Sequence, residues 1–196
     1  MDNFKFVRNG IKYIKHWPRK GEISVGLVGV GGWGRQYVDI LRGSDIFELR
    51  VCFDRNKELL QSVCSSFGCV EAESLDELLT DDGLQAVVIV TPNFLHYEQC
   101  INAIKQGKHV FVEKPIANTI EEAKKVFRAG KAKNVIISVG HNVRRRSEFR
   151  MMKRLIDTGE IGEVIMIEAN NSQPIGDGRE TSWRLNVDTC PSGPLS

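Results

Sequence analysis

With 196 residues, 41% of them hydrophobic, the chain can bury one complete core and part of a second, which predicts a soluble globular protein. An odd number of cysteines without a C-x-x-C pair argues against a disulfide framework and indicates a reducing compartment, so we expect a cytoplasmic protein. No apolar run approaches the roughly 18 to 20 residues of a membrane-spanning helix, and the N-terminus lacks the apolar core of a secretion signal. The five cysteines are Cys52, Cys64, Cys69, Cys100 and Cys190.

The net charge of +2 hides a basic segment at the start of the chain. Residues 1–20 contain six lysines or arginines and one aspartate, a net charge of +5, so the other 176 residues carry −3. Asn9-Gly10 lies between two short apolar stretches, which is the pattern of a β-hairpin turn. A basic amphipathic helix is the other interpretation, and its apolar side would carry Phe4, Val7, Ile11 and Ile14. This N-terminal extension is therefore a structural arm, a disordered lead-in or an organelle-targeting segment.

From residue 21 to 140, strand and helix patterns alternate, which predicts an α/β fold with a doubly wound parallel sheet. Short β-branched runs without alternation are typical of strands covered on both faces. The predicted strands are Ile23–Gly29, Phe47–Asp54, Ala86–Thr91, Lys108–Val112 and Val135–Val139. The predicted helices cover residues 32–42, 56–67 and 94–107, and two capping boxes of the form Ser/Thr-x-x-Glu place further helix starts near residues 75 and 120.

A G-x-G-x-x-G motif joins the first predicted strand to the first predicted helix. Gly29 permits the tight turn, Gly31 lets the backbone approach a pyrophosphate, and Gly34 lets the helix pack closely on the strand. The N-terminus of a helix favours an anion, so the turn from Gly29 to Gly34, with Gly32 and Trp33, is the predicted pyrophosphate site.

Asp54 ends the second predicted strand, twenty residues after Gly34, where a carboxylate accepts hydrogen bonds from the adenosine ribose. The motif and Asp54 together predict dinucleotide binding. Asp54 would repel a 2′-phosphate and therefore favours NAD, whereas Arg55 would attract that phosphate and favours NADP. We expect NAD, with NADP as the alternative.

Thr91, Pro92 and Asn93 follow the predicted strand at 86–91, at the strand's carboxyl end, where ligands bind in open parallel sheets. Asn93 also suits the N-cap of the next helix, so capping and a cofactor contact are both open. His96 lies in the first turn of that helix and is either a packed histidine or a contact to the cofactor.

Lys114 follows another strand at its carboxyl end, between Glu113 and Pro115. It should therefore face the same crevice as the cofactor. An amine acts as a base only when part of it is neutral, and burial or nearby positive charge moves its pKa in that direction. In isolation, a solvated lysine in a turn would explain the same pattern.

These residues resemble the Gfo/Idh/MocA oxidoreductases, the family that includes glucose-fructose oxidoreductase and inositol dehydrogenase. The resemblance covers about residues 23–195, with its motifs in the family's order. After the glycine motif and Asp54 come Thr91-Pro92-Asn93 with His96, Glu113-Lys114-Pro115, Gly140-His141-Asn142 with Arg144, and Gly159-Glu160-Ile161-Gly162.

The resemblance implies an NAD(P)-binding Rossmann domain at residues 21–140 and the start of a C-terminal α/β substrate domain at residues 141–196. It implies that Lys114 takes part in proton transfer while a hydride moves between a sugar or polyol carbon and the nicotinamide. It also implies a cis peptide bond before Pro115, and a homo-oligomer in the full-length form. No metal ligand is implied.

The segment after residue 141 departs from the family's pattern. Arg145 and Ser147 replace an aromatic residue and a proline, although Ser147 suits a helix N-cap. The basic cluster around Arg144 is short and has no aromatic platform, so we expect no nucleic-acid partner; Arg144 either contacts a substrate anion or belongs to a solvated face. One strand is expected over residues 163–171.

The family's Asp- and His-bearing helix would come next, after Trp183-Arg184 and residues 192–195, and the chain does not include it. We therefore expect the front half of an enzyme. Two functions remain: an NAD(P)-dependent sugar or polyol dehydrogenase, or a non-catalytic dinucleotide-binding fragment or half-enzyme. Another type of dinucleotide-binding dehydrogenase is a weaker alternative, which the sequence Glu113-Lys114-Pro115 disfavours.

Overall fold

The computed structural model describes residues 23–170 and 186–190. The expectations for the N-terminal extension, for Trp183-Arg184 and for residues 192–195 lie outside them. Six strands form a sheet with the order β3-β2-β1-β4-β5-β6, as predicted for a doubly wound fold. The chain divides into two compact units, Met1–Val88 and Ile89–Ser196, which are described in turn.

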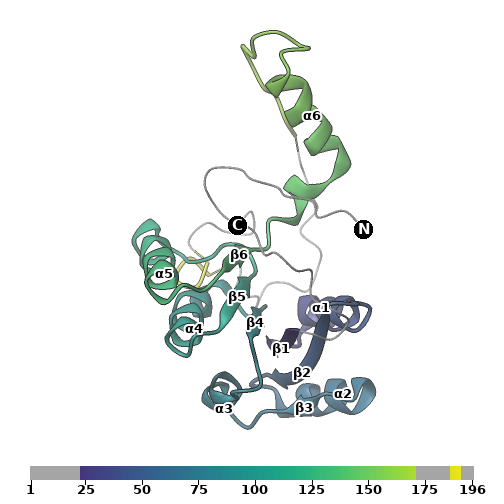
Figure 1. Ribbon diagram of the computed structural model, residues 1–196, viewed down its shortest axis with the longest axis vertical. Helices are drawn as coiled ribbons and strands as arrows, with labels where there is room; N and C mark the ends of the chain where they lie inside the picture. The colour runs from purple at the N-terminus through teal and green to yellow at the C-terminus, as the bar shows by residue number, and fades with distance from the viewer. Residues whose placement is uncertain (1–22, 171–185, 191–196) are drawn as a thin grey trace. The chain divides into compact units, whose positions relative to one another are not determined.

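The first unit alternates strands and helices from β1 to β4 (Figure 1). Its elements are β1 (Ile23–Val28), α1 (Gly32–Arg42), β2 (Phe47–Phe53), α2 (Lys57–Phe67), β3 (Val70–Glu71), α3 (Leu75–Thr80) and most of β4 (Ala86–Ile89). β1 pairs with β2, and β2 with β3, both in parallel. Buried aliphatic side chains from the strands and helices, including Leu27, Leu60 and Leu78, form its core.

The second unit continues the alternation. Its elements are α4 (Asn93–Lys105), β5 (His109–Val112), α5 (Ile120–Lys133), β6 (Ile137–Val139), the 3₁₀ turn η1 (Asn142–Arg145) and α6 (Ser147–Asp157). β5 and β6 pair in parallel, and α4 packs on β5 and α5. Val112, Ile104 and Val126 are buried in the core of this unit, whereas α6 has no buried residue. None of the helices in the described residues is long and apolar enough to cross a membrane.

Side-chain caps begin three of the six α-helices in the described residues, α2 at Asn56, α3 at Ser74 and α5 at Thr119. Thr119 accepts a hydrogen bond from the Glu122 N–H at 3.2 Å, and the Glu122 carboxylate accepts one from the Thr119 N–H, so the predicted capping box is confirmed. Gly68 ends α2 with a φ of +71°, the left-handed conformation that glycine adopts at helix ends. Helices also begin at Leu75 and Ile120 as predicted.

Three predictions are wrong, two of them for single residues and one for a segment. Asn93 is the first residue of α4 rather than its N-cap, because Pro92 occupies the cap position and the Asn93 side chain is buried. Ser147 is likewise the first residue of α6, and its hydroxyl donates to the Glu148 carboxylate instead of capping the helix. Residues 163–170 are exposed and form no strand, because no neighbouring strand pairs with them within the described residues.

Candidate functional site

The β1–α1 turn of the first unit is built around glycines. Gly29 has a φ of +94°, which an L side chain rarely adopts. A Cβ on Gly34 would lie 2.1 Å from the Gly29 carbonyl oxygen, so only glycine lets α1 start this close to β1. A Cβ on Gly31 or Gly32 would meet nothing within 4 Å. The turn therefore combines tight internal packing with an open outer side.

The N-terminus of α1 is suited to an anion. Gly31 is its N-cap residue, no side chain caps the helix, and its first turn contains no acidic residue. Helix N–H groups and the positive end of the helix dipole are thus not neutralised by a carboxylate of the first turn. With the open side of Gly31 and Gly32, this fits a pyrophosphate approached by backbone atoms. Trp33 is 53% exposed beside the turn.

Asp54, directly after β2, holds this turn in place. Its Oδ2 accepts a hydrogen bond from the Val30 N–H at 2.8 Å, and its Oδ1 accepts one from the Asn56 N–H at 2.9 Å. Each carboxylate oxygen can accept a further hydrogen bond, so Asp54 can fix the turn and still receive ribose hydroxyls. Arg55 is exposed next to it.

In the second unit, His96 connects the ends of two strands. Its ring nitrogens lie 2.8 Å from the Thr91 carbonyl oxygen, after β4, and 2.6 Å from the Pro115 carbonyl oxygen, after β5. The side chain is 0% exposed, and burial lowers its pKa, while the two carbonyls and the Glu113 charge act in the opposite direction. His96 therefore links the two strand ends and is fully covered by protein.

The turn after β5 presents Lys114. The Lys114 N–H donates to the Glu113 carboxylate at 3.1 Å, and the peptide bond between Lys114 and Pro115 is cis, as the family resemblance implied. A Cβ on Gly140 would lie 2.8 Å from Glu113 Oε1, so the glycine after β6 leaves room for this carboxylate. The Lys114 side chain is exposed. The turn thus holds the Glu113 carboxylate beside Gly140 and leaves the Lys114 side chain exposed to solvent.

A cleft of about 820 Å³ lies beside this turn, between Lys114, the η1 turn and one side of α6. Its lining includes five cationic side chains and one carboxylate, that of Asp157, which pairs with Lys153. The cationic side chains are Lys114, Arg144, Arg150, Lys153 and Arg154. Arg144, which the sequence singled out, therefore lies in the same cleft as Lys114.

The residues after β4 are held by contacts that the sequence did not predict. The Thr91 hydroxyl donates to Gln99 Oε1 at 2.5 Å, and the Asn93 amide donates to Cys190 Sγ at 3.7 Å. Asn118 also contacts the Thr189 carbonyl oxygen at 3.5 Å. Residues 186–190 thus pack against Asn93 and Asn118. No motif among neighbouring residues predicts these contacts, because most of the partners are far apart in the sequence.

Comparisons with known proteins agree with this geometry. Residues 23–141 match the GFO_IDH_MocA model, described as an oxidoreductase family with an NAD-binding Rossmann fold. A scyllo-inositol 2-dehydrogenase (NADP(+)) of Bacillus subtilis is 32% identical over 188 residues, which cover 92% of this chain and 50% of the relative. A glucose-6-phosphate 3-dehydrogenase of the same species is 32% identical over 146 residues, which cover 74% of this chain and 41% of the relative.

A solved structure is also similar. Scyllo-inositol dehydrogenase from Lactobacillus casei, with bound NAD(H) and scyllo-inositol, superimposes with a TM-score of 0.68 at 28% identity, over 72% of this chain and 42% of that one. The chain spans half or less of the length of each of these three proteins.

Proposed function

The chain belongs to the Gfo/Idh/MocA family of NAD-binding oxidoreductases. We propose that it binds a nicotinamide dinucleotide and forms the cofactor-binding part of a dehydrogenase that acts on a sugar or polyol. The observation that carries the proposal is the β1–α1 turn, which is closed at Gly34 and open at Gly31. Comparable turns approach the pyrophosphate of dinucleotides through backbone atoms.

The first unit supplies the residues for the adenosine end of the cofactor. Gly29, Gly31, Gly32, Trp33 and Gly34 border the pyrophosphate, and Asp54 receives the ribose hydroxyls. The Asp54 carboxylate favours NAD over NADP, whereas Arg55 could bind the 2′-phosphate of NADP. In the second unit, the residues assigned to the cofactor are Thr91, Pro92, Asn93 and Glu113. His96 positions Thr91 and Pro115 rather than contacting the cofactor, since it is 0% exposed.

Lys114 is the proposed catalytic residue. When bound, the cofactor supplies the hydride acceptor or donor. Lys114 takes the proton of the substrate hydroxyl at Nζ, or returns it in the reverse direction. The Glu113 carboxylate, which receives the Lys114 N–H at 3.1 Å, fixes the backbone from which the side chain extends.

The cleft beside Lys114 is the proposed substrate site. Sugars and polyols are the substrate class that fits relatives acting on inositol and glucose 6-phosphate. The excess of cationic side chains favours substrates carrying a phosphate or carboxylate, with Arg144 as a contact. We retain the homo-oligomer of the full-length form as part of this proposal.

Titration of the chain with NAD⁺ and NADP⁺ tests cofactor binding. We expect saturable binding of NAD⁺, and a loss of at least about tenfold in affinity in Gly31→Ala, because the added methyl occupies the open side of the turn. Gly43→Ala is the matched control, since Gly43 ends the same helix and its Cβ would make ordinary contacts. Equal affinity in all three proteins would refute the assignment.

A turnover assay with inositols and sugar phosphates tests Lys114. In the active enzyme, Lys114→Ala should reduce kcat by about 10²-fold or more while NAD⁺ binding is retained. Lys124→Ala, which removes an exposed lysine of α5, should leave kcat unchanged. Dinucleotide binding with no turnover on any substrate would instead favour a non-catalytic binding module.

A further inference from the structure

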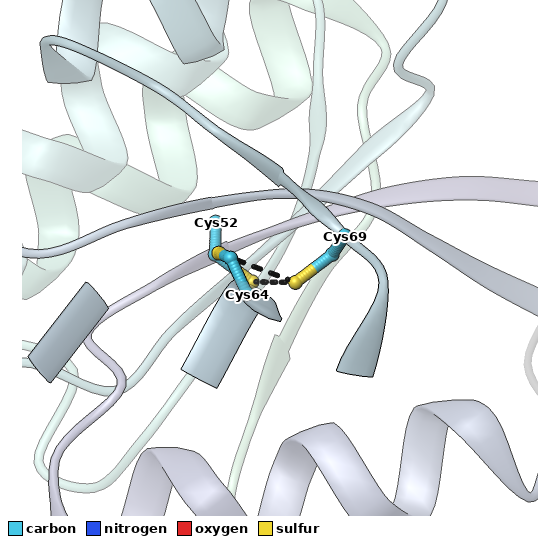
Figure 2. A group of neighbouring side chains, drawn as sticks. All are labelled: Cys52, Cys64 and Cys69. Atoms are coloured by element: carbon cyan, nitrogen blue, oxygen red, sulfur yellow. Dashed lines mark hydrogen bonds between the residues drawn. The ribbon is translucent and has the colours of Figure 1, made fainter. Parts of the chain in front are cut away.

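Three cysteines of the first unit converge on one point (Figure 2). Cys69 Sγ lies 3.4 Å from Cys52 Sγ and 3.3 Å from Cys64 Sγ, and all three sulfurs lie within 4.8 Å of one another. Cys52 and Cys64 are buried at 0% and 3% exposure, and Cys69 is partly exposed. We call Cys52, Cys64 and Cys69 the thiol cluster.

The local fold produces this convergence. Cys64 lies in the last turn of α2, whose end is closed by a hydrogen bond from the Gly68 N–H to the Cys64 carbonyl oxygen at 2.7 Å. The left-handed Gly68 turns the chain back, so Cys69, the next residue, returns to Cys64. Cys52 comes from β2, the strand next to the edge strand β3, where it pairs in register with Glu71 of β3. Helix, loop and strand therefore each supply one sulfur.

We propose that the thiol cluster is a binding site for a thiophilic d¹⁰ metal ion, Zn²⁺ or Cu⁺. Tetrahedral thiolates at about 2.3 Å from zinc lie about 3.8 Å apart. The two Sγ–Sγ separations of 3.3 and 3.4 Å need to open by only about 0.4 to 0.5 Å to reach that spacing. A disulfide would need one pair to close to about 2.05 Å and would leave the third sulfur over. Three convergent sulfurs thus fit a metal better than an oxidised pair.

The surroundings also favour a cation. The cluster adjoins the C-terminal end of α2, which is the negative end of the helix dipole. The Glu71 carboxylate adds negative charge that acts on both Cys64 and Cys69. Reactive, oxidisable thiolates are typically found in electropositive surroundings, which this position lacks.

The two candidate ions differ in the ligands that they need. Cu⁺ is satisfied by three soft thiolates, whereas Zn²⁺ takes a fourth ligand, which solvent can supply on the partly exposed side of Cys69. In either case the ion would tie α2 and the following loop to β2. The inference is independent of the proposed dehydrogenase function, because no residue of the cluster belongs to the candidate site.

Titration with Cd²⁺ tests the site directly, because thiolate ligands give cadmium an ultraviolet charge-transfer band. We expect saturation at one ion per chain, with displacement by Zn²⁺ or Cu⁺ showing which ion binds more tightly. Cys69→Ala should weaken binding at least about 100-fold. Cys100→Ala, a buried cysteine of α4 outside the cluster, is the matched control and should bind as the unmodified chain does.

Native mass spectrometry of the unmodified chain with Zn²⁺ gives a second readout that needs no variant. One bound ion per chain supports the site. An unchanged mass, or a mass lower by two hydrogen atoms that shows a disulfide, would overturn the proposal. Equal Cd²⁺ binding in Cys69→Ala and the unmodified chain would also overturn it, since the ion would then be held elsewhere.

Discussion

The turns after β1 and after β5 present functional groups by opposite means. The turn after β1 is made of backbone: Gly29 has a positive φ, and the Gly29 carbonyl oxygen occupies the space that a side chain on Gly34 would need. The turn after β5 is made of side chains: His96 contacts the Pro115 carbonyl oxygen, and Glu113 receives the Lys114 N–H.

This difference determines how each turn fails. In a turn made of backbone, an added side-chain atom lowers stability where the turn is closely packed and has little effect where the turn is open. A turn held by buried side chains is sensitive to atoms removed and to pH, because its hydrogen bonds depend on protonation. A single added methyl should therefore separate positions within the first turn, and titration should distinguish the second turn from the first.

The largest effect is expected for Gly34→Ala. The new Cβ would lie 2.1 Å from the Gly29 carbonyl oxygen, and backbone atoms cannot move aside cheaply. We expect a loss of about 3 kcal/mol or more in the free energy of unfolding, measured by urea denaturation. Gly31→Ala adds the same methyl in open space and should cost only about 1 kcal/mol, because alanine is a poorer N-cap. Similar losses in both variants would show that the turn is not closed at Gly34.

His96→Ala should have the next largest effect. The change leaves a cavity and removes a ring whose two nitrogens lie at the Thr91 and Pro115 carbonyl oxygens, to one of which a neutral ring donates. We expect a loss of about 3 kcal/mol in the free energy of unfolding. His109→Ala, at a half-buried position on β5 where the ring accepts one backbone N–H, is the control and should cost less.

The same histidine makes stability depend on pH. Burial lowers the pKa of His96 below its ordinary value of 6.5, so the unfolded chain binds this proton more readily than the folded one. The contribution of His96 is therefore fully present above about pH 6.5 and declines as the pH falls below that value. Urea denaturation from about pH 8 to pH 5 should show a smaller decline in His96→Ala than in the unmodified chain. An identical slope would mean that the folded and unfolded states bind this proton equally well, so that burial of His96 does not shift its pKa.

The sequence predicted the first turn better than the second for a physical reason. Glycine spacing and helix caps are local, so the β1–α1 turn, the Thr119 capping box and the end of α2 at Gly68 could all be predicted from neighbouring residues. Asn93 was wrongly predicted as an N-cap, because the local sequence does not show its contact with Cys190, which lies 97 positions away. The thiol cluster was missed for the same reason: the spacing of Cys52, Cys64 and Cys69 follows no metal-ligand motif, and only the fold brings them together.

A smaller effect is expected for Gly140→Ala. Its Cβ would lie 2.8 Å from Glu113 Oε1, the far end of a flexible side chain that can move. The cost in stability should be about 1 kcal/mol, but the Glu113 carboxylate would leave the Lys114 N–H, so kcat should fall while NAD⁺ affinity is unchanged. Steady-state kinetics and cofactor titration measure the two quantities. Unchanged kcat would show that the position of Glu113 does not matter to Lys114.

The smallest effect on stability is expected for Asp54→Asn, the one side chain on which the backbone turn depends. An amide keeps one acceptor oxygen, so either the Val30 N–H or the Asn56 N–H loses its partner, at a cost of about 1 kcal/mol. Loss of the negative charge should raise the affinity for NADP⁺ relative to NAD⁺ by about tenfold, since the 2′-phosphate is no longer repelled. Asp39→Asn, on the exposed side of α1, should change neither quantity. If the NADP⁺ to NAD⁺ ratio stayed constant in Asp54→Asn, Asp54 would be a structural support of the turn and would not select the cofactor.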